Sequence, residues 1–191
     1  MSSEEDLKSI NEIIAARFKK IEDAIESAET ITELFENLID GIENEFTVPF
    51  VWLTLIDHQT IAPVLGEIKM SERLESRLSV VSKELFDKIL TGGIKPVLAN
   101  KDLQPFYRLL PHSRKYFIRS VAVVPFTMDG QIIGTWNNGD ADANRYEPDM
   151  KTDLIESLSG KLSARLTRLA LGKESETKSV GSHDQTGENH D

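Results

Sequence analysis

Apolar positions along the chain either follow a helical period or gather in short runs that suit buried strands. The clearest pattern spans residues 118–136, where two runs rich in β-branched residues flank Asp129 and Gly130. Asp-Gly tolerates the positive φ angles of a type I′ turn, so this stretch predicts a β-hairpin. The run 121–124 is nearly all apolar, which indicates a strand covered on both faces near the middle of a sheet.

Residues 4–28 contain no Gly or Pro and carry an apolar stripe at alternating three- and four-residue steps, broken at Arg17. This spacing predicts one long helix with a heptad-like seam. Such a helix either packs along its own domain or forms a dimerising, signal-transmitting helix, and we favour the second interpretation. It assigns dimerisation to the apolar residues Leu7, Ile10, Ile14, Phe18, Ile21 and Ile25.

The next part of the chain predicts a helix and two strands. Thr30-Ile31-Thr32-Glu33 is a capping box, in which Thr30 caps a second helix and Glu33 reaches back. Residues 50–56 are apolar on both faces and predict a buried strand. Residues 61–68 contain a Pro and a Gly, which suits a weaker strand at a sheet edge.

The second half of the domain predicts a helix, a short strand, the hairpin and a final helix. Ser71 caps a helix whose apolar stripe is Leu74, Leu78, Val81, Leu85 and Ile89. A strand at 96–99 leads into a long connection over 100–117, and connections of this length are usually functional or partly helical. Residues 137–145 predict a polar loop, and Pro148 suits the first turn of the last helix.

These elements predict an α+β architecture. An antiparallel sheet of five or six strands has the terminal helices against one face, with the middle helix and the long loop over the other. We divide the chain into a coiled-coil-like helix (1–29), a domain (30–171) and a polar tail (172–191). The tail has a single apolar residue after Gly172, Val180, and predicts disorder.

Composition narrows the functional classes. The 191 residues carry a net charge of −10 and include no cysteine, and the pI is near 4.9. An acidic surface disfavours nucleic acid and anionic membranes as partners. The absence of cysteine excludes thiol catalysis, disulfides and Cys-ligated metals. With no signal peptide or apolar span in the sequence, we expect a cytoplasmic protein.

A search for catalytic groups favours a protein that is not an enzyme. There is no Gly-x-Ser-x-Gly elbow for a serine nucleophile. Thr91-Gly92-Gly93 is interpreted as a helix stop and not as a phosphate-binding loop. No two histidines have metal-ligand spacing, so no metal or other cofactor is expected.

The long connection holds a basic and aromatic cluster in an otherwise acidic protein. Guanidinium groups beside aromatic rings suit a carboxylate or phosphate on a small ligand. The alternative is a loop held to the acidic surface by salt bridges, with the two tryptophans as ordinary core residues. The candidate ligand-binding residues are Trp52, Tyr107, Arg108, His112, Arg114, Tyr116 and Trp136.

The order of elements resembles a GAF domain, the small-molecule sensor fold related to PAS domains. The resemblance is closest to the bacterial domain-of-unknown-function 484 family, a GAF-like family. Its motifs are matched by Val121 to Pro125, Ile132-Ile133-Gly134, Gly93 to Val97, and Arg145-Tyr146-Glu147-Pro148-Asp149-Met150-Lys151-Thr152-Asp153-Leu154. Tyr146 replaces the family's usual phenylalanine, and Asn137-Asn138-Gly139 departs from its small or apolar residue followed by glycine-serine.

The resemblance implies a regulatory function. GAF domains mostly bind a small molecule between sheet and loop and pass the result through terminal helices, often in a dimer. Members that attach bilins or reduce methionine sulfoxide act through cysteine, which this chain lacks. We therefore expect a non-enzymatic, homodimeric signalling domain that binds a small metabolite at the 100–117 loop. The alternative is a structural module that binds another protein and no ligand.

Overall fold

The computed structural model describes residues 2–91, 93–111 and 117–180, which form an α+β domain. Within these residues, no helix combines the length and the apolarity needed to cross a membrane. The elements are α1 (Ser2–Ser27), α2 (Ile31–Phe46), β1 (Phe50–Ile56), the 3-10 turn η1 (Gln59–Ile61), α3 (Ala62–Lys69), α4 (Glu72–Glu75), β2 (Leu78–Val81), α5 (Lys83–Ile89), β3 (Val97–Ala99), the 3-10 turn η2 (Phe106–Arg108), β4 (Ser120–Met128), β5 (Gln131–Asp140) and α6 (Asp153–Val180).

The sheet has five strands in the order β2-β1-β5-β4-β3. The β4–β5 hairpin is confirmed: Asp129 and Gly130 have φ angles of 50° and 77°, and Met128 pairs with Gln131 across the turn. One pair differs from the antiparallel expectation, because β2 lies parallel to β1. Its connection passes through α3 and α4, and such a crossover returns the chain in the same direction.

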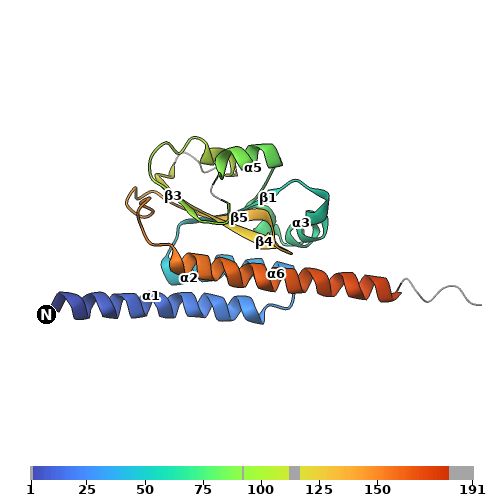
Figure 1. Ribbon diagram of the computed structural model, residues 1–191, viewed down its shortest axis with the longest axis horizontal. Coiled ribbons are helices and arrows are strands. Elements are labelled where there is room, and N and C mark those ends of the chain that lie inside the picture. Colours follow the sequence, from blue (N-terminus) through green and yellow to red (C-terminus); the bar gives the residue numbers. More distant parts are fainter. Residues whose placement is uncertain (1, 92, 112–116, 181–191) are drawn as a thin grey trace, which may run out of the picture.

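Helices and loops cover both faces of the sheet (Figure 1). On one face α2 and α6 lie against the strands, and α1 packs beneath them. On the other face α5 and the segment around η2 cover a second, smaller apolar core. The expected placement of the terminal helices on one face and the middle helix and loop on the other is therefore confirmed.

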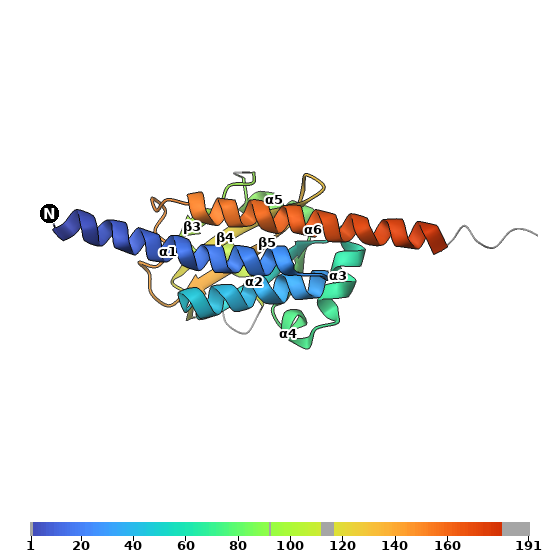
Figure 2. The same ribbon diagram turned by 90° about the horizontal axis from the view of Figure 1, so that it is seen from below.

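The two terminal helices run in the same direction along one another. Glu22 of α1 accepts a hydrogen bond from Lys161 of α6 (2.8 Å), and Arg165, one turn further on, donates to the carbonyl of Ala28. Figure 2 shows that α1 projects past the sheet at its N-terminal end, while α6 projects past the opposite end. The domain thus joins two helices that leave it in opposite directions.

Helix α1 consists of an exposed half and a buried half. Ile21 and Ile25 are buried in the main core. Helices α1 and α2 pack closely at Gly41, where an added Cβ would lie only 2.8 Å from Ile21 Cγ1. In contrast, Leu7 is 59% exposed and Ile10 is 51% exposed. The second half of α1 therefore belongs to the core of the domain.

The capping box at the start of α2 is confirmed. Thr30 accepts a hydrogen bond from the Glu33 amide (3.1 Å), and the Glu33 carboxylate accepts one from the Glu29 amide (2.8 Å). These two bonds satisfy amide groups that a helix start leaves unpaired, and they separate α1 from α2.

The predictions for residues 61–68 and 71–89 are wrong. The first segment is helical, because Pro63 suits a first helical turn and Ile61, Val64 and Ile68 bury one helical face. The second segment is interrupted by β2, where Leu78 pairs with Leu53 of β1. Pairing with a buried strand outweighs the local helical spacing.

Three boundaries in the last third also differ from expectation. The expected polar loop at 137–145 begins later, because Asn137, Asn138 and Gly139 continue β5 against β1 and β4. Helix α6 begins at Asp153 and not at Pro148. Its backbone continues to Val180, so residues 172–180 are helical, because extending an existing helix is far easier than nucleating one. Residues 181–191 lie outside the described residues.

Candidate functional site

The face of the sheet under η2 was the expected ligand site. There the chain closes on the sheet at Leu109, whose carbonyl accepts hydrogen bonds from Trp52 Nε1 and Thr54 Oγ1, both at 2.9 Å. Leu109 and Leu110 are buried against the sheet. Their side chains occupy the apolar space beside Trp52 in the second core.

A buried polar network extends this closure across the sheet. Thr54 Oγ1 accepts from Asn137 Nδ2 (3.0 Å), and Asn137 Oδ1 accepts from Thr135 Oγ1 (2.9 Å). All three side chains are fully buried. A network whose members satisfy one another holds a loop in one position, whereas a partly satisfied network would be costly. The described part of this face is therefore built for a fixed loop.

The structure describes four of the seven predicted ligand residues and does not bring those four to one site. Tyr107 is half-buried and Arg108 is exposed, and Tyr107 packs against the edge of the second core. His112, Arg114 and Tyr116 lie outside the described residues. The two tryptophans lie on opposite faces, because Trp52 pairs with Asn137 and the neighbouring residue Leu53 pairs with Trp136.

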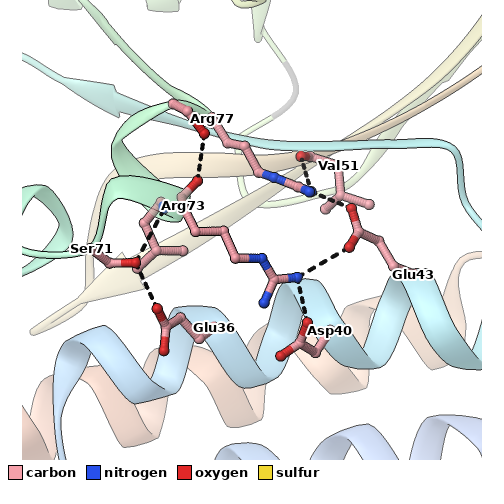
Figure 3. A network of polar contacts seen from close by, with 9 residues as sticks. Glu36, Asp40, Glu43, Val51, Ser71, Arg73 and Arg77 are labelled. Carbon is pink, nitrogen blue, oxygen red and sulfur yellow. Dashed lines mark hydrogen bonds and ion pairs between the residues drawn. The ribbon is translucent and has the colours of Figure 1, made fainter.

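Figure 3 shows the ion pairs of two arginines that also line a smaller cavity beside Trp52. This cavity has a volume of about 370 Å³ and is lined by Arg73 and Arg77. Arg73 pairs with Asp40 and with Glu43 (3.2 Å), and Arg77 pairs with the other oxygen of Glu43. Both guanidinium groups are thus engaged by carboxylates of α2, and the pairs fix the α4 segment to that helix.

A larger cavity lies on the other side of the sheet, and we call it the helix-side pocket. It has a volume of about 700 Å³, within the range of small-molecule sites. Its walls come from α1, the end of α2, β5, the segment before α6 and the first turns of α6. The lining is mainly apolar and includes Ile14, Phe18, Ile42, Phe46, Val48, Leu98, Trp136, Met150, Leu154, Ile155 and Leu158.

Two lining residues of β5 each carry a buried polar atom that has no partner in the described part of the chain. Trp136 is fully buried and Asn138 is 5% exposed. Among the described residues, Trp136 Nε1 and Asn138 Oδ1 have no hydrogen-bond partner. Buried polar atoms are nearly always paired, and leaving one unpaired costs about 1–3 kcal/mol.

Arg145 and Tyr146 form the polar wall of the helix-side pocket. Arg145 donates a hydrogen bond to the Phe46 carbonyl, lies 3.5 Å from the Asp140 carboxylate and lies over the Tyr146 ring. Burial raises the pKa of Tyr146 to about 12, although nearby Arg145 opposes this rise. The charge of Arg145 is already balanced within the protein, and the two other charged lining residues, Lys151 and Asp153, are exposed and opposite in sign.

The sequence prediction groups Trp136 with the η2 segment, whereas the structure places Trp136 on the opposite face of the sheet from Trp52; the prediction does not single out Asn138. As a polar pair, Asn137-Asn138 predicts the start of a loop, and this interpretation assigns neither side chain to a face of the sheet. Extending the strand would have placed Trp136 and Asn138 on one face and Asn137 on the other. The signal was therefore present in the alternation of residues along β5.

The raised pKa of Tyr146 predicts a loss of stability at alkaline pH. Tyrosine in an unfolded chain titrates near 10, and the folded protein holds the neutral form to about 12. The folded state therefore keeps a proton that the unfolded state releases, so this contribution is complete below about pH 10 and declines towards pH 12. In urea unfolding, Tyr146→Phe should flatten the decline in stability over this interval. An unchanged decline would show that other groups cause it.

Comparison with known proteins supports the architecture. No protein-family model matches the sequence, and no curated protein matches it. Among solved structures, it is similar to the free methionine-R-sulfoxide reductase from Neisseria meningitidis in complex with its substrate, with a TM-score of 0.53. The chain has a GAF-like fold. The match covers 81% of this chain and 89% of that one at 15% sequence identity, so the likeness shows the GAF-like fold alone.

Proposed function

We propose that this GAF-like chain is a non-enzymatic regulatory domain that forms a homodimer through the exposed half of α1. The observation that carries the proposal is an unpaired stripe on that half, formed by Asp6, Ile10, Ile13 and Arg17. In such a dimer α1 would contact a second copy at one end of the domain, while α6 extends from the opposite end. This arrangement is suited to passing a change in the packing of α1 against α6 from one end of the domain to the other.

The chemistry of the chain supports a role without catalysis. The similar solved structure is a reductase, but a thiol mechanism needs cysteine and this chain has none. His58 accepts a hydrogen bond from the Thr60 amide (3.2 Å) and so caps η1. Glu22, a buried carboxylate, is paired with Lys161. These groups have structural roles that explain their positions.

The stripe on α1 has the pattern of a self-complementary surface. Its four residues follow steps of four, three and four, which keeps them on one side of the helix. All four are exposed. Within the described residues the structure shows no ion pair for Asp6 or Arg17. The stripe therefore presents a negative end, an apolar centre and a positive end.

This order of charges favours an antiparallel pair of α1 helices. When the stripe meets a second copy running in the opposite direction, Asp6 of each helix lies opposite Arg17 of the other, at the two ends of the contact. Ile10 of each helix lies opposite Ile13 of the other, in the middle of the contact. A parallel pair would place each charge beside the same charge. An exchange of identical patches in this way is the isologous arrangement of a two-fold dimer. Because the patch is short, we expect a dissociation constant in the micromolar range.

Sedimentation velocity over a range of concentrations tests this dimer. Replacing Ile10 and Ile13 with glutamine should raise the dissociation constant by about tenfold or more, since two apolar contacts are lost on each helix. The matched control Lys8→Gln with Glu12→Gln changes the opposite side of the same turns and should leave the constant unchanged. A protein that stays monomeric at all concentrations, or a dimer insensitive to the isoleucines, would contradict the proposal.

A charge exchange tests the orientation of the helices. Arg17→Asp should weaken the dimer, because two aspartates would then face each other at each end. Adding Asp6→Arg to the same chain restores opposite charges in an antiparallel pair and should recover the dimer. In a parallel pair the doubly changed protein would still place like charges together, so failure of this rescue would reject the antiparallel arrangement.

The alternative function is a structural module that docks another protein through the same stripe and responds to no ligand. The closed η2 face favours it, because the described residues there form a packed core and a satisfied network. The two functions differ in their behaviour in isolation. The regulatory dimer forms from this chain alone, whereas the docking module stays monomeric until its partner is added.

A further inference from the structure

The helix-side pocket combines an apolar wall with two unmatched polar atoms. Trp136 Nε1 is a hydrogen-bond donor and Asn138 Oδ1 is an acceptor, and neither has a partner among the described residues. The two residues lie two apart on β5 and line the same pocket. Both atoms are buried, so an occupant that moved aside the side chains covering them and supplied one acceptor and one donor would satisfy both, while its remaining surface packed against the apolar wall.

The charges around the pocket argue for a neutral occupant. Arg145 is engaged by the Phe46 carbonyl and Asp140, so it offers no unbalanced charge to an anion. Lys151 and Asp153, the other charged lining residues, are exposed and opposite in sign, so together they favour neither an anion nor a cation. A carboxylate deep in the pocket would also face the negative end of the Asn138 amide. Burying a charge without a partner is far more costly than burying a neutral amide that is hydrogen-bonded.

We infer that the helix-side pocket binds an uncharged, mainly apolar small molecule that carries an acceptor beside a donor, as in an aromatic lactam. The lactam carbonyl would accept from Trp136 Nε1, and the lactam N–H would donate to Asn138 Oδ1. The pocket volume of about 700 Å³ is ample for a two-ring molecule of this kind. The site lies on the opposite face of the sheet from the η2 segment.

The position of the pocket gives such a ligand a route to the helices. One wall is α1, through Ile14 and Phe18, and another is the start of α6, through Leu154 and Leu158. Ile13, which belongs to the proposed dimer stripe, is adjacent to Ile14 on the same turn. This inference deepens the proposed function, because occupancy would bias the packing of α1 against α6.

The two tryptophans supply an internal control for a binding experiment. The chain has two tryptophans, and their indole N–H groups give two signals in a nitrogen-15 NMR spectrum that Trp52→Phe assigns. Carbostyril, a neutral two-ring lactam, serves as the probe. Its addition should shift the Trp136 indole signal downfield as a new hydrogen bond forms. The Trp52 signal should stay in place, because its donor is bound to Leu109.

Matched ligands and variants decide the outcome. N-methylcarbostyril lacks the donor and naphthoate carries a charge, so each should bind at least about tenfold more weakly than carbostyril. Ala15→Phe, which fills the pocket from α1, and Asn138→Leu, which removes the acceptor, should both abolish saturable binding, with folding checked by thermal unfolding. No saturable shift at Trp136, equal binding of the three probes, or unchanged binding to folded Ala15→Phe would overturn the inference.

These results are independent of the dimer measurement. Binding is detected at Trp136 whether the protein is a monomer or a dimer, and the dimer is detected by sedimentation without any probe. Lactam binding by a monomer would retain the pocket and reject the proposed dimer. A dimer whose Trp136 signal does not respond would retain the dimer and reject the pocket.

Discussion

Replacing Gly134 with alanine should lower the free energy of unfolding by about 3 kcal/mol or more, a large share of the stability of a domain this size. Gly134 lies in β5, between β1 and β4 in the middle of the sheet. A Cβ at this position would lie 2.2 Å from the Thr54 carbonyl oxygen and 2.9 Å from Leu55 Cδ2. The oxygen belongs to the backbone of a paired strand, so relief of the clash requires β1 and β5 to separate.

Gly160 provides the matched control for this substitution. It lies within α6, and a Cβ there would have no neighbour within 4 Å. Gly160→Ala should therefore raise the free energy of unfolding by about 0.5–1 kcal/mol, because alanine restricts the unfolded chain and favours helix. Urea unfolding followed by circular dichroism measures both variants. Near-native stability of Gly134→Ala would show that β1 and β5 are not packed as closely as described.

The hairpin and the buried strands could be predicted because their signals are local. Asp129 and Gly130 supply the backbone angles of the turn, and the flanking apolar runs leave one choice of pairing. The capping box at Thr30 likewise depends on residues within four positions of one another. Where an element is determined by interactions among a few neighbouring residues, the sequence alone is sufficient to predict it.

The segment from Ser71 to Ile89 could not be predicted in the same way. Leu78 and Val81 keep the spacing of a helix face, and that spacing is the main local signal. Their conformation is decided by β1, whose residues Leu53 and Ile56 pair with them across the sheet. A contact between residues 25 positions apart leaves no local trace, so the helical interpretation was the natural one.

The candidate site shows the same limit. Trp52 and Trp136 are both aromatic residues on predicted strands, and their types do not reveal which face each one occupies. The pairing of Leu53 with Trp136 places them on opposite sides. Asn138 becomes a pocket residue because β5 continues past Trp136. The helix-side pocket therefore depends on strand register and helix packing, which emerge only in the assembled fold.

The division of α1 predicts a sharp contrast between two isoleucines of one helix. Ile25 is fully buried beneath α2 and α6 and Ile13 is 51% exposed. Ile25→Ala should lower the free energy of unfolding by about 2–4 kcal/mol, since it removes buried methyl groups and leaves a cavity. Ile13→Ala should leave the stability of the monomer within about 0.5 kcal/mol, because surface changes away from such features have little effect.

Urea unfolding at protein concentrations below the dimer dissociation constant measures the stability changes of Ile25→Ala and Ile13→Ala without a contribution from self-association. If α1 belongs to the core through its second half, the Ile25 variant unfolds at much lower urea and the Ile13 variant does not. If residues 1–29 instead form an independent helix, neither change alters the main transition. Equal losses from both would mean that the first half of α1 is also packed in the monomer, and the stripe of Asp6, Ile10, Ile13 and Arg17 would then not be free to bind a second copy.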